Sequence, residues 1–196
     1  KILKLTVGIV LLATMALFNA SAIAKDTAAS LSVYVVNYPL QYFAQRIGGP
    51  EVRVTFPAPP DGDPAFWKPG AEQIVAYQKA DLILLNGASY AKWVSYVSLP
   101  ASRMVDTSAS FADQLIPLED ELTHSHGLAG KHEHGDVAFT TWLNPRQALV
   151  QARIVRDALI RRGPEAATDF NQRFDLLAAD LTNLDEQIAA IVTSGA

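Results

Sequence analysis

The sequence predicts an α/β protein in which a parallel sheet is sandwiched by helices and is followed by one long helix. The first observation is an alternation of short strand and helix patterns between residues 31 and 106. Parallel strands need a crossover segment between them, and the helices of these crossovers cover both faces of the sheet. The second observation is that the pattern becomes entirely helical from residue 144 onward. The 196 residues suffice for one domain, and because they include no cysteine its core forms without disulfides.

The first half of the predicted sheet consists of two strands and one helix. Residues 31–36 are rich in β-branched side chains, which is typical of a buried strand. Pro39 opens a helix that runs through Ile47 and stops at a pair of glycines. Alternating apolar residues then predict a second strand over 52–56. The loop that follows, over 57–70, contains five prolines and is therefore stiff.

Two further strands complete the predicted sheet. A helix over 71–79 leads into an apolar strand over 81–85, which ends at an Asn-Gly pair. We expect another helix over 89–97 and a short fourth strand over 104–106. In open α/β sheets, ligands bind beyond the carboxyl ends of the strands. The proline-rich loop and the Asn-Gly turn both emerge at this edge of the sheet.

Two helices follow. Asn144 is a good N-cap, Pro145 suits the first helical position, and this helix ends at Gly163. The next helix carries a narrow apolar stripe, formed by Phe170, Phe174, Leu177, Leu181, Leu184, Ile188 and Ile191. At about 28 residues it would be roughly 40 Å long, which is more than a small domain needs. It is either the seam of a coiled-coil dimer or a spine that packs along the domain and leads into something more.

The first 24 residues are typical of a secretory signal peptide. Two lysines precede an apolar run over 5–18, and Ala22-Ile23-Ala24 forms a cleavage site. The run is too short to span a membrane comfortably, so we expect cleavage, export to a Gram-negative periplasm and no membrane-inserted segment afterwards. Loss of the two lysines would change the net charge from −4 to −6. A surface of this charge binds nucleic acid poorly.

All four histidines lie in a polar loop over 119–136, as two His-x-His pairs separated by a glycine-containing hinge. The hinge lets both pairs converge on one tetrahedral ion, and a nearby acid or a water completes the coordination. Imidazole favours Zn²⁺ or a related divalent transition metal over the oxygen-preferring Mn²⁺. The alternative is a solvated loop with weak, adventitious affinity. The predicted metal ligands are His124, His126, His132, His134 and Glu133.

Several segments, in this order, resemble the periplasmic solute-binding proteins of zinc and manganese ABC importers. The matching segments are VVNYPL (35–40), IGG (47–49), DPAFWKP (63–69), KADLILLNG (79–87) and TWLNP (141–145). In that family, one long rigid helix joins two α/β lobes, and the metal binds between them. The resemblance implies that residues 25–163 form the N-terminal lobe and residues 164–196 the linker helix. We expect the second lobe to be missing from this chain.

Two positions depart from the family pattern. The family usually has a histidine after Asp-Pro in the first loop, where this chain has Ala65. The next ligand histidine of the family, two residues before the tryptophan, corresponds to Thr140. An alanine methyl cannot ligate a metal, and a neutral threonine hydroxyl is a poor zinc ligand. Neither N-lobe ligand implied by the resemblance is therefore present.

The resemblance implies a periplasmic protein that captures zinc or a related divalent metal for the membrane permease of an ABC importer. One alternative is a periplasmic metal buffer or metallochaperone without a transport role. Another is an interaction protein that binds no metal and dimerises through its C-terminal helix. The sequence contains no nucleophile elbow, phosphate loop or His-Glu-x-x-His motif, so we predict that the chain is not an enzyme.

Overall fold

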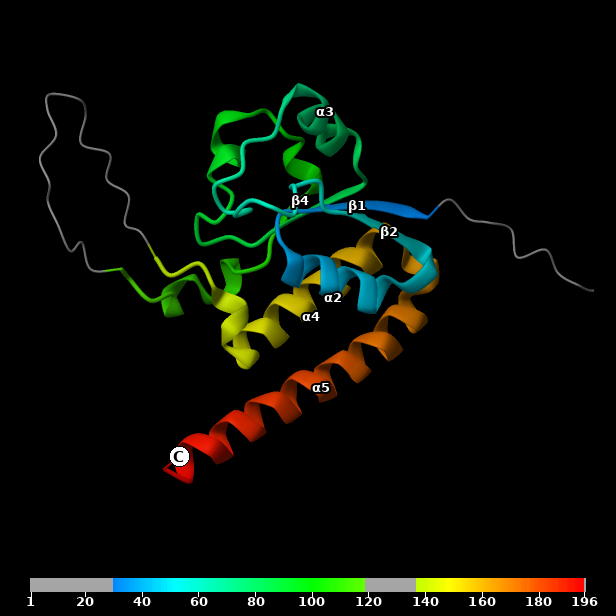
Figure 1. Cartoon of the computed structure of the whole chain (residues 1–196). Coiled ribbons are helices and arrows are strands. Elements are labelled where there is room, and N and C mark those ends of the chain that lie inside the picture. Colours follow the sequence, from blue (N-terminus) through cyan, green and yellow to red (C-terminus); the bar gives the residue numbers. More distant parts are fainter. Residues whose placement is uncertain (1–29, 119–136, 196) are drawn as a thin grey trace, which may run out of the picture.

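The computed structural model describes residues 30–118 and 137–195 (Figure 1). The predicted signal peptide and the predicted ligands His124, His126, His132, His134 and Glu133 lie outside the described residues. Within the described ranges, no helix is both long enough and apolar enough to cross a membrane. The predicted α/β class is confirmed.

Four parallel strands form the sheet. They are β1 (Leu31–Val35), β2 (Val52–Thr55), β3 (Leu82–Leu85) and β4 (Met104–Asp106). Their spatial order is β2-β1-β3-β4, and Val33 of β1 lies in register between Val54 of β2 and Leu82 of β3. Each strand begins and ends within one residue of its predicted bounds, because the β-branched and apolar runs mark the buried strands directly.

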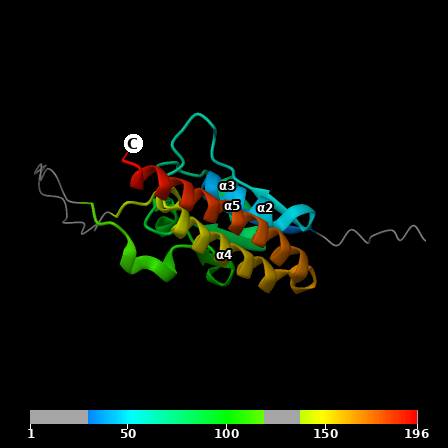
Figure 2. The same ribbon diagram turned by 90° about the horizontal axis from the view of Figure 1, so that it is seen from below.

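Helices cover both faces of the sheet, as Figure 1 and Figure 2 show. Three of them, α2 (Tyr38–Gly48), α4 (Pro145–Arg162) and α5 (Ala167–Thr193), pack together on one face. The fourth, α3 (Ala71–Lys79), lies on the other face, where the Tyr77 hydroxyl donates to the Val35 carbonyl oxygen at 2.8 Å. Short 3-10 helices occupy Gly49–Glu51, Lys92–Tyr96, Ala101–Arg103, Ala109–Gln114, Thr141–Leu143 and Pro164–Ala166.

The helix predicted over 89–97 is wrong in type and extent. This segment contains only a 3-10 helix, Lys92–Tyr96. The preceding residues 87–89 have φ angles of 75°, 49° and 59° and so form a left-handed turn. L-residues in this conformation cannot begin a right-handed α-helix. The 3-10 helix still contributes to the core, because Trp93 is buried with its ring centroid 4.9 Å from that of Tyr77.

The apolar stripe of α5 is divided into a buried half and an exposed half. Its first members are buried against the neighbouring helices, namely Phe170, Phe174 and Leu177. Its last members are between 41% and 59% exposed, namely Leu184, Ile188 and Ile191. The first half of the helix is therefore a spine that packs along α2 and α4. For the exposed half, the dimer seam stays a prediction.

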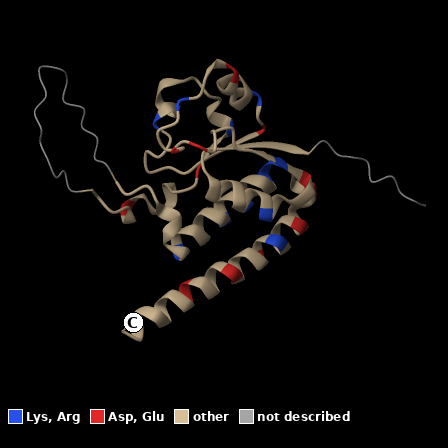
Figure 3. Cartoon of the chain, in the orientation of Figure 1, with Lys and Arg blue, Asp and Glu red and all other residues tan. Residues whose placement is uncertain are grey.

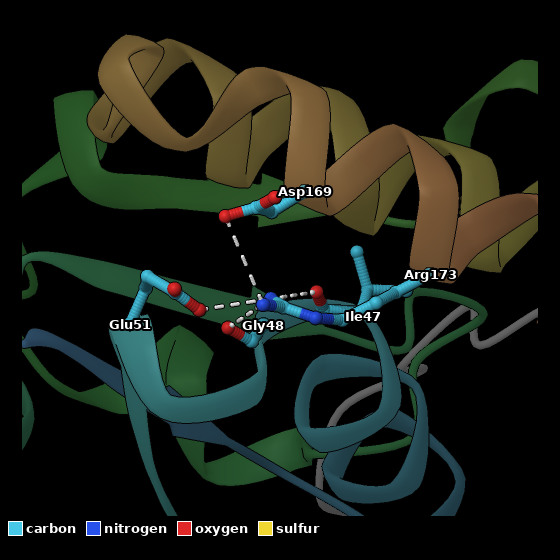
Figure 4. A network of polar contacts seen from close by, with 5 residues as sticks. All are labelled: Ile47, Gly48, Glu51, Asp169 and Arg173. Carbon is cyan, nitrogen blue, oxygen red and sulfur yellow. Dashed lines mark hydrogen bonds and ion pairs between the residues drawn. The ribbon is translucent and has the colours of Figure 1, made fainter.

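One arginine fastens α5 to the end of α2 (Figure 4). Arg173 Nη1 donates to the carbonyl oxygens of Ile47 and Gly48 at 3.3 and 3.0 Å, and to Glu51 Oε2 at 2.8 Å. The last carbonyls of a helix have no partner within the helix, and its dipole favours a cation at this end. The guanidinium therefore caps α2 and holds α5 in place with the same three contacts.

Charged residues recur along the length of α5 (Figure 3), and two of them form further ion pairs with the helices beside it. Asp180 lies 2.8 Å from Arg46 of α2, and Asp185 lies 2.8 Å from Arg146 of α4. Both pairs are solvent-exposed and contribute little to stability individually. They add one contact from α5 to each of the two helices on which it packs.

Candidate functional site

The carboxyl edge of the sheet brings together the two segments in which the resemblance implies metal ligands. The first is the loop over 63–69, called the ligand loop below, which follows β2. The second is the segment around Thr140, which leads into α4. The side chain of Asn86, at the end of β3, joins this second segment to the sheet by donating to the Phe139 carbonyl oxygen at 3.0 Å.

The ligand loop is a tight turn braced by its own aspartate. Asp63 Oδ1 accepts a hydrogen bond from the Ala65 amide at 2.9 Å, and the Phe66 amide donates to the Asp63 carbonyl oxygen at 3.1 Å. Short side-chain-to-backbone bonds of this kind are typical of aspartate before a turn. Ala65 is only 3% exposed, and its methyl group belongs to the hydrophobic core. The position at which the resemblance implies the first ligand therefore holds a methyl group and offers no ligand atom.

Thr140, at the second ligand position, is exposed at the start of a 3-10 helix. Its carbonyl oxygen accepts from the Leu143 amide at 3.0 Å. A neutral hydroxyl at an exposed position is a weak ligand for zinc. Neither position therefore supplies a strong ligand, in agreement with what the sequence implies.

A buried network of amides and hydroxyls lies beneath this edge. Asn37 Nδ2 donates to Asn86 Oδ1 at 3.0 Å, and Gln151 Nε2 donates to Thr107 Oγ1 at 2.9 Å. Thr141 Oγ1 donates to Gln151 Oε1 at 3.2 Å. All five side chains are at most 4% exposed, and no buried polar side-chain atom of the described residues lacks a partner. Fully satisfied networks of this kind rigidify the elements they join, here the ends of β1, β3 and β4 and the start of α4.

Sequence reasoning missed this network. One signal was available, because Gln151 interrupts the apolar face that Ala148, Ala152 and Val155 form on α4. A glutamine at an inward-facing position needs buried polar partners. Two of its three partners, Thr107 and Asn86, lie 44 and 65 residues away along the chain, and a single sequence does not identify them.

An aromatic cluster covers the network beside the ligand loop. The ring of Tyr90 lies 5.2 Å from that of Phe139 and 5.7 Å from that of Trp142. Burial, with smaller contributions from the charges of Asp63 and Tyr38, raises the pKa of Tyr90 to about 12. The phenol is therefore neutral at physiological pH, and a neutral phenol is a poor metal ligand. The cluster therefore packs beside the ligand loop and supplies no metal ligand.

The aromatic residues of the ligand loop itself behave differently from one another. Trp67 is half-buried and packs edge-on against Trp93, with ring centroids 6.2 Å apart. Trp67 therefore packs against the hydrophobic core. Phe66 does not, because its side chain is 64% exposed. Among residues 30–118 and 137–195, no three His, Cys, Asp or Glu side chains are placed to hold a metal ion together.

Comparisons with known proteins agree with the fold. The family model described as "ZnuA: Zinc-uptake complex component A periplasmic" matches residues 33–196. The chain is 27% identical over 179 residues to the iron-binding protein YfeA of Yersinia pestis, covering 89% of this chain and 54% of that protein. It is 25% identical over 150 residues to the manganese-binding lipoprotein MntA of Halalkalibacterium halodurans, covering 76% and 46%. The chain thus spans about half the length of these relatives.

A solved structure shows the same arrangement of elements. The Zn(II)-bound ZnuA-like domain of Streptococcus pneumoniae AdcA superposes with a TM-score of 0.64 at 18% identity, covering 80% of this chain and 54% of that domain. The parallel sheet and its helices therefore match one lobe of such a protein. Members of this family are metal-binding solute-binding proteins, so the prediction that the chain is not an enzyme is confirmed. The family match extends over most of the chain, which therefore belongs to the family of the periplasmic zinc-uptake complex component A.

Proposed function

We propose that the chain captures a divalent transition metal, with zinc preferred, as the solute-binding component of an ABC importer. Family membership and the matching lobe architecture support this role. The relatives are named for iron, manganese and zinc, so the fold alone does not select the metal. The four clustered imidazoles favour zinc, because nitrogen-rich ligand sets bind it more tightly than manganese.

The residues at the two expected ligand positions support a metal site in another part of the chain. Ala65 is a buried methyl group and Thr140 is an exposed hydroxyl, so this lobe lacks the imidazoles of its relatives' pattern. We therefore propose that the metal is held by the histidine-rich stretch. The proposed ligands are His124, His126, His132 and His134, with Glu133 or a water completing the coordination. Because most of these ligands are nitrogen atoms, the chain would then bind zinc more tightly than manganese.

The proposed cellular setting is the one that the family resemblance implies. After removal of residues 1–24 the chain would act in the periplasm, not inserted in the membrane, and would deliver its cargo to a membrane permease. The long helix α5 would be the linker towards a second lobe. The two altered ligand positions also favour a second candidate, a periplasmic metal buffer or metallochaperone that keeps the lobe without a transport role.

Zinc titration calorimetry on the whole chain tests the proposed site. Replacing all four histidines with asparagine keeps the length and polarity of the stretch while removing every imidazole. A matched control replaces Glu119 and Asp136 with their amides, which lowers the local negative charge but keeps the imidazoles. We expect the asparagine variant to lose zinc binding and the control to retain it within about threefold, the scale of a weak electrostatic contribution.

Two results would contradict the proposal. Equal zinc affinity in the parent and the asparagine variant would place the site elsewhere. Absence of binding in the parent chain would rule out metal capture by this chain alone. A permease reconstituted in vesicles separates the importer from the buffer, because only the importer increases zinc uptake when the chain is added.

A further inference from the structure

A cavity of about 540 Å³ lies behind the ligand loop, between this loop and the 3-10 helix Lys92–Tyr96. Pockets that hold small organic ligands have volumes of about 300–1,000 Å³. The residues that line the cavity all belong to the described part of the chain. Its lining consists of Ala65, Phe66, Trp67, Lys68, Pro69, Lys92, Trp93, Tyr96 and Val97.

Aromatic side chains form the floor and the rim of this cavity. Trp93 is 6% exposed and is fixed from two sides, by Trp67 at 6.2 Å and by Tyr77 at 4.9 Å between ring centroids. Phe66 and Tyr96 are 64% and 82% exposed. The floor is therefore rigid, while two large rings at the rim have most of their surface in water. Burying such rings against a flat apolar ligand is favourable, and stacked or edge-on aromatic pairs add to the gain.

The charge of the lining has one sign. Lys68 and Lys92 are the ionisable basic side chains among the nine lining residues, and the nine include no acid. The chain as a whole has a net charge of −4, so this positive spot differs from the average of the protein. A carboxylate on an apolar ligand complements it, whereas a cation is repelled.

We propose that this cavity binds a planar aromatic carboxylate, with its ring between the exposed rings of Phe66 and Tyr96 and its charge facing Lys68. The volume, the four aromatic rings and the charge of Lys68 each fit this class of ligand. None of the lining residues of the cavity is a proposed metal ligand. The site shares the ligand loop with the family's metal-binding edge, because Ala65 and the residues after it line the cavity.

Binding of 1-naphthoate to the whole chain tests this inference without any metal. Two of the three tryptophans line the cavity, so the titration is followed by tryptophan fluorescence and checked by calorimetry. 1-Naphthylmethanol, which has the same ring and no charge, should bind at least threefold more weakly, as expected for the loss of an exposed charge pair. Phe66→Ala should weaken naphthoate binding about tenfold, because one stacked ring and its buried area are lost.

Lys68→Gln should weaken naphthoate about threefold and leave 1-naphthylmethanol unchanged. Tyr42→Ala and Lys79→Gln are the matched controls, since Tyr42 and Lys79 are also exposed but lie outside the cavity, and both should bind as the parent does. Equal binding of the acid and the alcohol, equal losses in the controls, or no binding of naphthoate would each overturn the inference. The variant without the four histidines should bind naphthoate normally whatever its zinc affinity, so this inference and the proposed function fail independently.

Discussion

Replacing Arg173 with methionine should loosen α5 from the end of α2. The guanidinium makes two hydrogen bonds to the carbonyl oxygens at the end of α2 and one to Glu51. Its side chain is 28% exposed and that of Glu51 22%, so these contacts are only partly screened by water. Hydrogen bonds to a charged group contribute about 1.5–3 kcal/mol when they are well shielded. Allowing for partial exposure and for the packing that methionine retains, we expect a loss of about 2 kcal/mol.

Urea unfolding followed by circular dichroism measures this loss as a shift of the midpoint at unchanged slope. Arg146→Met is the matched control, because Arg146 also joins α5 to a neighbouring helix through one ion pair of 2.8 Å. Its side chain is 78% exposed, so we expect a change within the error of the measurement. If the two substitutions shift the midpoint equally, the argument that Arg173 anchors the helix end is refuted.

Three further predictions concern the edge of the sheet and the long helix. Gly87→Ala should cost more than about 2 kcal/mol in thermal unfolding, because φ is 75° and the new Cβ would lie 1.9 Å from Ser108 Oγ. Phe174→Ala should cost about 3–5 kcal/mol and Ile188→Ala far less in the monomer, since only Phe174 is buried. If Ile188→Ala lowers the free energy of unfolding as much as Phe174→Ala does, under conditions in which sedimentation detects a dimer, the result would favour the dimer seam instead. Folding raises the pKa of Tyr90 from 10.0 to about 12, so its contribution to stability is complete below pH 10 and is lost as the pH rises towards 12. Tyr90→Phe should flatten the stability profile in that window, and an unchanged slope would contradict the assignment.

Most of the fold was predictable because its determinants are local. The strands are marked by apolar β-branched runs, and α2 and α4 are marked by their caps. Asn37 Oδ1 accepts from the Leu40 amide, and Asn144 Oδ1 accepts from the Arg146 amide, each at 3.0 Å. The helix predicted over 89–97 was wrong for the opposite reason, because the conformation of this segment is not determined locally. A left-handed conformation at alanine and serine is imposed by the surrounding structure, and neither residue type signals it.

The site was predictable only in part, because its parts differ in how far their partners lie along the chain. The brace at Asp63 spans two residues and follows from the Asp-Pro turn itself. The altered ligand positions could be found by comparing the motifs with the family pattern. The hydrogen bond from Asn37 to Asn86 spans 49 residues, and the cavity behind the ligand loop requires the two loops to be placed in space. Neither follows from periodicity or spacing.

The residues at the carboxyl edge of the sheet show in what respect this lobe departs from the family pattern. The network that would orient a ligand segment is complete, since Asn86 still holds the Phe139 backbone and Gln151 still joins Thr107 and Thr141. What is absent is the ligand atoms themselves. Ala65 is 3% exposed and lies between the hydrophobic core and the cavity behind the ligand loop, so an imidazole at this position would have to fit beside a packed core. The chemistry of Ala65 and Thr140 thus supports the proposal that metal capture relies on the histidine-rich stretch.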